Sequence, residues 1–320
     1  MRLTILALLL ALPVYAQTVA LPPTCLWVEN GRVQFQGDLQ LPAALTDAQH
    51  LGMLRPLGQG LLLWTTEQRD DTGNLIQFSL SLADLKTGDS HQFFKDLDPF
   101  SIGTDWRLQR VALAASGRAL LLRVRLGGTG GFISLYTLML EAPYYWYELK
   151  QDMDVWDSAS ADGTVQARPY WALTPDWRDA PTEREARYAT VIVVGKSTPL
   201  GRKLWEIQSY RERSAWAQPD IEQTAVSPNG GQVAFVNPAG LWLVGVSDST
   251  PRLLLGEGTE PLTYSSDPVW APDGKLLYFT RTLYTKNTIS SVDICALDPA
   301  HPETVTVVRP GGQRLCLPTL

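Results

Sequence analysis

The chain has 320 residues, a formal net charge of −6 and 45% hydrophobic residues. This hydrophobic content is typical of a folded globular protein and too high for a disordered one. The charges are scattered and acidic overall, which excludes a binder of phosphate backbones, so we expect no nucleic-acid partner. Only three His and three Cys occur, and we therefore expect no His/Cys metal centre and no cofactor.

The first 16 residues predict a signal peptide. Arg2 precedes an apolar run of about ten residues, and the small residue Ala16 follows it. The run is shorter than the roughly 20 residues of a membrane-spanning helix. We expect cleavage after Ala16, which leaves residues 17–320 as a periplasmic or secreted domain with no transmembrane segment. A buried N-terminal helix is the alternative reading of the same run.

Beyond residue 17 the sequence predicts β-strands. Short runs rich in Val, Leu, Tyr, Trp and Thr alternate with turns made of Gly, Asn, Asp or Pro. The predicted strands include Leu61–Thr66, Leu75–Leu82, Ala119–Val124, Phe132–Leu140, Thr190–Val194, Val233–Val236, Leu241–Val246 and Leu276–Thr280. Near the start, Cys25–Phe35 predicts a hairpin around Asn30-Gly31, because these two residues tolerate the positive φ angles of tight turns. Near the end, Gln313–Leu317 predicts a short strand.

Two segments repeat without a gap. Val226–Phe235 and Trp270–Phe279 lie 44 residues apart, and each contains an apolar residue, a small residue, Pro, Asn or Asp, Gly, and then a strand. Three weaker copies have their Pro-equivalent positions at residues 57, 115 and 161. A four-stranded propeller blade uses about 40–50 residues, so the longer intervals require insertions. The longest one predicts a loop over Pro169–Ala189.

The two repeated turns, Ser227-Pro228-Asn229-Gly230 and Ala271-Pro272-Asp273-Gly274, resemble the TolB-type, WD40-like β-propeller repeat. The segment Leu80–Gly88 is also similar to it, at the place where that family has the third strand of a blade and the hairpin to the outer strand. The resemblance implies a single all-β propeller. The α/β domain that precedes the propeller in TolB proteins is expected to be absent, because strand signals begin by Leu26.

Five repeats and one blade built from both chain termini predict six blades, with five blades as the alternative. A two-sheet sandwich or two small β domains is the other reading of an all-β chain. In the propeller, Cys25 and Cys316 would lie on neighbouring strands of the terminal blade. Export to an oxidising compartment then predicts a disulfide between them. Cys295 lies inside the apolar run Val292–Leu297 and is expected to be a buried free thiol.

Motifs for catalysis are absent from the sequence. It contains no Gly-x-Ser-x-Gly, His-x-x-x-His or Cys-x-x-Cys pattern, so no catalytic residue is predicted. His50, His91 and His301 are far apart and are expected in exposed loops or at strand ends. Gly127–Gly131 lacks the Lys and the helix of a phosphate-binding loop and is expected to be a hairpin turn.

Two groups of residues, one acidic and one aromatic, can each be interpreted in two ways. Asp152, Asp154, Asp157 and Asp162 could bind Ca²⁺, but their spacing is not that of an EF-hand, so we expect a solvated loop and no metal site. The aromatic run Tyr144, Tyr145, Trp146 and Tyr147 could fill the space between blades or form a surface for sugars or peptides. We retain it as a possible binding surface.

These features predict an exported, monomeric, non-enzymatic β-propeller of the cell envelope that binds a protein, peptide or glycan ligand. The alternative is a propeller hydrolase, lactonase or lyase with a carboxylate or Ca-dependent site in the central channel.

Overall fold

The structure is a computed structural model. It describes residues 19–58, 60–71, 75–94, 106–113, 119–126, 132–140, 146–149, 158–161, 165–173, 187–194, 202–210, 223–237, 239–247, 250–256, 262–286 and 288–318. The predicted signal peptide, residues 1–16, lies outside these ranges, as does the whole set Asp152, Asp154, Asp157 and Asp162. Within these ranges no helix has the length and apolar character needed to cross a membrane.

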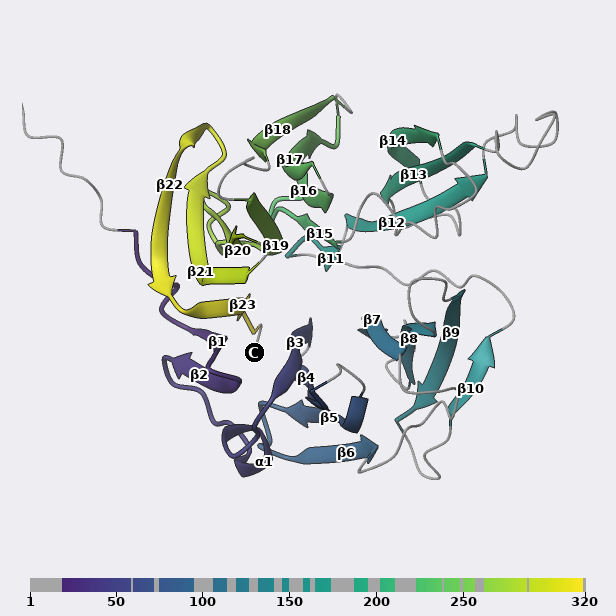
Figure 1. Cartoon of the computed structure of the whole chain (residues 1–320), viewed down its shortest axis with the longest axis vertical. Coiled ribbons are helices and arrows are strands. Elements are labelled where there is room, and N and C mark those ends of the chain that lie inside the picture. The colour runs from purple at the N-terminus through teal and green to yellow at the C-terminus, as the bar shows by residue number, and fades with distance from the viewer. Residues whose placement is uncertain are drawn as a thin grey trace, which may run out of the picture.

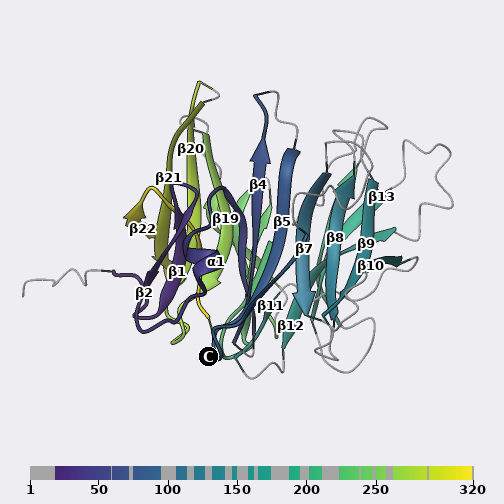
Figure 2. The ribbon, with the colours of Figure 1, turned by 90° about the horizontal axis from the view of Figure 1, so that it is seen from below.

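The described strands form antiparallel sheets arranged around a common centre (Figure 1). Both ends of the chain meet in one three-stranded sheet, which we call the terminal sheet; its order is β2-β1-β23, and its strands are β1 (Cys25–Glu29), β2 (Arg32–Gln36) and β23 (Gly312–Cys316). Each of the other sheets consists of four strands that follow one another in the chain. Seen from the side, the long strands of neighbouring sheets run in roughly the same direction (Figure 2).

The first of these four-stranded sheets contains β3 (Leu51–Gly58), β4 (Leu61–Arg69), β5 (Leu75–Asp84) and β6 (Ser90–Phe94). The second contains β7 (Trp106–Leu113), β8 (Ala119–Leu126), β9 (Phe132–Met139) and β10 (Trp146–Leu149). The next contains β11 (Ser158–Ala159), β12 (Gln166–Leu173), β13 (Arg187–Val194) and β14 (Arg202–Tyr210). The fourth contains β15 (Gln223–Val226), β16 (Gln232–Asn237), β17 (Gly240–Gly245) and β18 (Pro251–Gly256). The fifth contains β19 (Leu262–Trp270), β20 (Leu277–Thr285), β21 (Thr288–Asp298) and β22 (His301–Pro310). One short helix, α1 (Ala43–Thr46), connects the terminal sheet to β3.

The predicted blade count needs correction. Among the described residues, the complete blades, with four strands of at least four residues each, are four in number: β3–β6, β7–β10, β15–β18 and β19–β22. The remaining two sheets are reduced, because β11 has only two residues and the terminal sheet has only three strands. The prediction of six blades, or of five, assumed equivalent units. It was wrong because each sequence repeat marks one turn, and a turn carries no information about the number or length of the strands around it.

The inner strands explain why several runs are apolar at every position. Leu62, Leu63 and Trp64 are consecutive in β4 and at most 2% exposed. Leu63 packs toward the β7–β10 sheet with Val111, whereas Leu62 and Trp64 pack toward the terminal sheet. Both faces of a blade are therefore buried, which removes the usual alternation of apolar and polar residues.

The terminal sheet begins with the predicted hairpin. Asn30 and Gly31 have φ angles of 52° and 71°, and the two strands around them pair from Glu29–Arg32 to Cys25–Gln36. The C-terminal strand β23 pairs with β1, and Leu26 lies opposite Cys316. The predicted hairpin and the predicted last strand are thus both confirmed.

The predicted Cys25–Cys316 disulfide is not present. Both residues are buried free thiols, as is Cys295. Cys316 lies opposite Leu26, and these two residues share one core cluster, while Cys25 belongs to the cluster on the other side of the sheet. Side chains alternate between the faces of a strand, so the two thiols point away from each other although their strands are neighbours. Cys295 is buried in β21, as predicted.

A second correction concerns the predicted loop Pro169–Ala189. Its first residues belong to β12 and its last residues to β13, and these strands pair up to Leu173–Tyr188. Residues 174–186 between them lie outside the described residues. The many polar and Trp residues of this segment suggested a loop. Whether residues of this kind form a strand or a loop depends on pairing with a neighbouring strand, which the sequence does not show.

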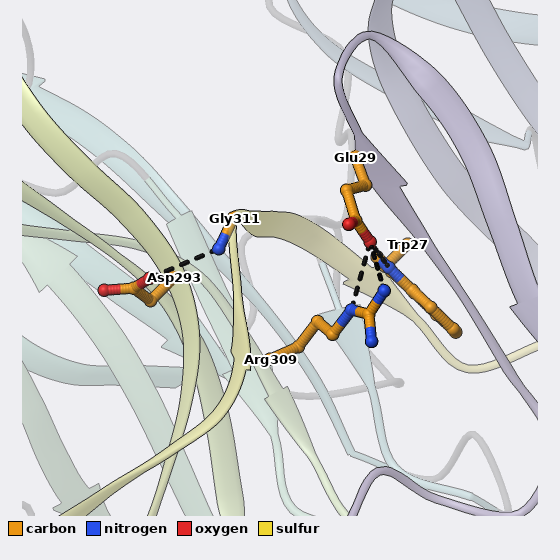
Figure 3. Close-up of polar contacts among 5 residues, drawn as sticks. All are labelled: Trp27, Glu29, Asp293, Arg309 and Gly311. Carbon is orange, nitrogen blue, oxygen red and sulfur yellow. Dashed lines mark hydrogen bonds and ion pairs between the residues drawn. The ribbon is translucent and has the colours of Figure 1, made fainter.

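Polar contacts join the terminal sheet to the β19–β22 sheet (Figure 3). Glu29 Oε2 accepts hydrogen bonds from Arg309 Nη2 at 2.8 Å, Arg309 Nε at 3.0 Å and Trp27 Nε1 at 3.1 Å. The hydrogen bond from Trp27 and those from Arg309 hold the pKa of Glu29 below its ordinary value. Close by, Gly311 N donates to Asp293 Oδ1 at 3.3 Å, where the chain passes from β22 to β23.

Candidate functional site

The strands nearest the centre of the structure are β23, β3, β7, β11, β15 and β19 (Figure 1). Residues of these strands from different sheets come close to one another, as contacts between β15 and β19 and between β19 and β23 show. A site on the inner strands can therefore combine side chains that are far apart in the sequence.

Asp267 on β19 has an unusual backbone. Its φ angle is 51°, in the left-handed region that residues with side chains seldom adopt. The pairing of β19 with β20 shifts register between Ser266 and Val269. Pro268 follows Asp267 and cannot donate a hydrogen bond to the ladder, which accounts for the bulge at this point. Strained polar residues of this kind persist where the surrounding structure holds them, often at functional sites.

Two neighbours hold the Asp267 carboxylate in place. Gln223 Nε2 on β15 donates to Asp267 Oδ1 at 3.0 Å, and Asp267 N donates back to Gln223 Oε1. Ser266 Oγ donates to Asp267 Oδ2 at 2.9 Å. Each carboxylate oxygen therefore accepts one hydrogen bond, and the side chain is fixed between the inner strands of two adjacent sheets.

Arg314 on β23 is the second charged inner-strand residue with a left-handed backbone, at φ 55°. Its N–H donates to Thr280 Oγ1 at 2.9 Å, and its Nη1 donates to the carbonyl of Leu51 on β3 at 2.9 Å. The backbone of Arg314 thus contacts the β19–β22 sheet, and its side chain reaches from the terminal sheet to the β3–β6 sheet. A guanidinium has five N–H donors. Among the described residues, the bond to Leu51 is the one that the Arg314 side chain makes, so most of its donors remain for a ligand.

We call Gln223, Ser266, Asp267 and Arg314 the inner-strand cluster. It offers a fixed carboxylate acceptor, an amide and a guanidinium on neighbouring strands around the centre. In the part of the chain that the structure describes, no three or more His, Cys, Asp or Glu side chains are grouped so that they could hold a metal ion.

The residues singled out in the sequence lie elsewhere. Tyr144 and Tyr145 are outside the described residues, while Trp146 and Tyr147 begin β10, the outermost strand of its sheet. His50, His91 and His301 are exposed, as predicted, and do not come together at the centre. The strands β8 and β9 pair up to Leu126–Phe132, and Gly127–Gly131, the predicted hairpin turn, lies outside the described residues.

The sequence did contain a signal for this cluster. Gln223 and Asp267 occupy equivalent positions in the two best repeats, since each lies three residues before the apolar residue that opens the repeated turn. An Asp-Pro pair inside a strand also predicts a bulge. Arg314 carries no comparable signal, because it reaches the cluster only through the pairing of β23 with β1.

The sequence matches no family model and no curated protein. Solved structures similar to this chain include TolB from Acinetobacter baumannii, with 10% identity, a TM-score of 0.49 and coverage of 92% of this chain and 65% of TolB. The chain thus spans less than two thirds of that TolB chain. The periplasmic gluconolactonase of Pseudomonas aeruginosa has 13% identity, a TM-score of 0.48 and coverage of 91% and 98%. An oligogalacturonate lyase in complex with manganese has 16% identity, a TM-score of 0.38 and coverage of 81% and 72%.

TolB-type β-propellers are therefore among the structural neighbours of this chain, as the repeated turns predicted. The neighbours also include a lactonase and a lyase. Similarity at these identities concerns the fold alone, because one propeller fold carries many functions.

Proposed function

We propose that the chain is an exported, non-enzymatic β-propeller that binds a protein, peptide or glycan ligand at the inner-strand cluster and serves as a scaffold of the cell envelope. The observation that supports this function is the position of Asp267, whose two carboxylate oxygens are held by Gln223 and Ser266. A carboxylate fixed in this way is suited to accept hydrogen bonds from a ligand.

The chemistry of the cluster fits ligands with alternating donors and acceptors. The free lone pairs of Asp267 accept N–H or O–H groups, and the free N–H groups of Arg314 donate to carbonyl or hydroxyl oxygens. Backbone amides of an extended peptide and hydroxyls of a sugar both present these partners. Recognition of this kind requires no proton transfer.

Capture of partners from an envelope fraction tests this function. The bait is the exported protein, compared with Asp267→Asn and with the control Asp273→Asn. The carboxylate of Asp273 also accepts a hydrogen bond, from the backbone N–H of Lys275 at 3.0 Å, but Asp273 is exposed in a turn. Loss of a charged acceptor should weaken capture at least about tenfold for Asp267→Asn, whereas Asp273→Asn should capture normally. Equal capture by both variants would contradict the site.

Export and the enzyme alternative have separate tests. Mass analysis of mature protein should find Gln17 as its first residue, and an intact Met1 would contradict cleavage. Metal analysis of the purified protein should find no stoichiometric metal. One bound Ca²⁺ per chain would instead favour the propeller hydrolase, lactonase or lyase.

A further inference from the structure

A cavity of about 200 Å³ lies between the α1 segment and the face of the β3–β6 sheet that points toward the terminal sheet. Its origin is the missing fourth strand of the terminal sheet, so that the segment from Ala43 to Ala48 covers this face instead. Leu45 fills the inner part of the gap and is fully buried. Farther out, this segment lines the space with the small side chains of Ala44, in α1, and of Ala48, two residues beyond the end of α1.

The opposite wall is a ladder of neutral polar side chains. Thr66 on β4 faces Ser79 on β5, and Ser81 and Gln92 continue the same face onto β6. Trp64 forms part of the floor and is 2% exposed. Ser79 and Ser81 are 5% and 3% exposed, whereas Gln92 and Ala44 are exposed. The cavity therefore has a buried polar floor and a mouth at the surface.

These hydroxyls have unused hydrogen-bonding capacity. Thr66 Oγ1 and Ser79 Oγ bond each other at 2.6 Å, which uses only one of their two O–H donors. In the part of the chain that the structure describes, the Ser81 hydroxyl has no hydrogen-bond partner in the protein, and it lines the cavity, where a ligand or water can reach it. A ligand with hydroxyl groups can supply the hydrogen-bond partners that these floor hydroxyls do not find within the protein.

The lining also limits the charge and size of the ligand. Of the residues that line the cavity, His91 alone can carry a charge, and it is exposed at the mouth. An ionised group on the floor of the cavity would lose its hydration without gaining a counter-charge there, because no other lining residue is ionisable. The volume is below the roughly 300–1,000 Å³ of sites for drug-sized molecules, which restricts the occupant to a group of about one ring.

We propose that this cavity is a second binding site, separate from the inner-strand cluster, for one neutral, hydroxyl-rich group such as a single sugar ring. The hydroxyls of Ser79, Ser81 and Thr66 hydrogen-bond it from the floor, and Gln92 does so from the rim. The ligand is either a free sugar or the end residue of a glycan, which present the same chemistry.

Ligand-detected NMR titrations of the mature protein test this site with glucose, N-acetylglucosamine, methyl β-glucoside and, as a charged control, glucuronate. Ala44→Phe fills the mouth of the cavity, and Ala43→Phe places the same side chain on an exposed alanine of α1 that does not line it. At least one neutral probe should bind wild type and Ala43→Phe alike, while Ala44→Phe should weaken its binding at least tenfold. Ser81→Ala should weaken binding about fivefold through the loss of one hydrogen bond.

Tighter binding of methyl β-glucoside than of glucose would assign the site to the end of a glycan, and the reverse would assign it to a free sugar. Asp267→Asn should leave this binding unchanged, which distinguishes the cavity from the inner-strand cluster. The proposal is overturned if no neutral probe binds, if glucuronate binds as tightly as the neutral sugars, or if neither Ala44→Phe nor Ser81→Ala weakens binding.

Discussion

The terminal sheet and the β19–β22 sheet are neighbours but are held together differently. The four strands of β19–β22 follow one another through hairpins, and each pairs with the next strand of the chain. The terminal sheet needs β23 to pair with β1 from the other end of the chain. Hydrogen bonds connect this end of the chain to the β19–β22 sheet. Arg309 donates to Glu29, and Tyr278 Oη donates to the carbonyl of Ala20, so these bonds join residues about 260–280 positions apart.

The comparison shows what a complete blade provides. Between the β15–β18 and β19–β22 sheets, apolar side chains such as Val236, Leu277 and Phe279 form one buried cluster. Beside the three-stranded terminal sheet, the short α1 segment replaces a strand and leaves the polar cavity. Pairing across the whole chain also closes a very long loop, whose entropy cost must be recovered by contacts at the junction.

The largest expected effect comes from truncating a buried Leu in each sheet. Leu26 and Leu277 are both fully buried, and each change to Ala should cost about 3 kcal/mol of unfolding free energy. Native-state hydrogen exchange should locate the two losses differently. Leu26→Ala should speed exchange in β1, β2 and β23, because this sheet can open separately. Leu277→Ala should speed it through β15–β22, and identical exchange patterns for the two variants would refute the contrast.

The two repeated turns offer the next comparison. Gly230 and Gly274 have φ angles of 70° and 71°, so a β-branched residue is strained at both. A Cβ at Gly230 would lie 2.8 Å from Val165 Cγ2, whereas the nearest atom to a Cβ at Gly274 is Pro228 Cδ at 3.7 Å. We expect Gly230→Val to cost about 3 kcal/mol and Gly274→Val about 1.5 kcal/mol, measured by urea unfolding. Equal losses of unfolding free energy would show that the Val165 side chain moves aside at no cost.

A smaller effect is expected at the junction of the two sheets. The folded-state pKa of Glu29 is lowered by Trp27 and Arg309. The contribution of this carboxylate is therefore complete above its unfolded pKa of about 4.5 and is lost as the pH falls through the lower folded value. Glu29→Gln should cost about 1 kcal/mol at pH 7, a small effect because the pair is partly exposed. The cost should be lower at pH 3, below the unfolded pKa, because part of the contribution of the carboxylate is lost there.

Glu303→Gln is the matched control for that change. Glu303 pairs with His301 at 3.7 Å, and both side chains are more than 70% exposed. Its unfolding free energy should stay within about 0.5 kcal/mol of wild type at both pH values. If Glu29→Gln lost the same unfolding free energy at both pH values, packing and not charge would stabilise the contact between the two sheets.

The smallest expected effect is that of a reducing agent on stability. Burial raises the pKa of Cys25 and of Cys295 to about 11 and raises that of Cys316 as well. All three thiols should react slowly in the native protein and fully after unfolding. Reduction should leave the melting temperature unchanged. A Cys25–Cys316 bond in non-reducing peptide maps of exported protein would contradict the arrangement of the terminal sheet.

Much of the fold was predictable because it depends on local signals. Asn30-Gly31 specifies a tight turn by its tolerance of positive φ, and the Gly of each repeated turn does the same. The segment Leu80–Gly88 was assigned to a third strand and its hairpin, and β5 and β6 occupy these places. These features need only a few neighbouring residues, so one sequence is enough to recognise them.

The candidate sites were not predictable to the same degree. Gln223 and Asp267 share a repeat position, yet their hydrogen bond depends on how two sheets pack. The cavity depends on a strand that the terminal sheet lacks, and no residue in the sequence marks a missing strand. The aromatic run was chosen for its composition, but Trp146 and Tyr147 begin an outermost strand.

The sequence by itself therefore determined the all-β class, the repeated turns and the likeness to TolB-type propellers, because turn chemistry and apolar runs are local properties. Only the tertiary structure decided the number of complete blades, the opposite faces of Cys25 and Cys316, the junction of Glu29 with Arg309 and the polar cavity under α1. Each of these depends on which distant strands pair and in which register. A shift of one residue in that register would turn every side chain of the strand to the other face.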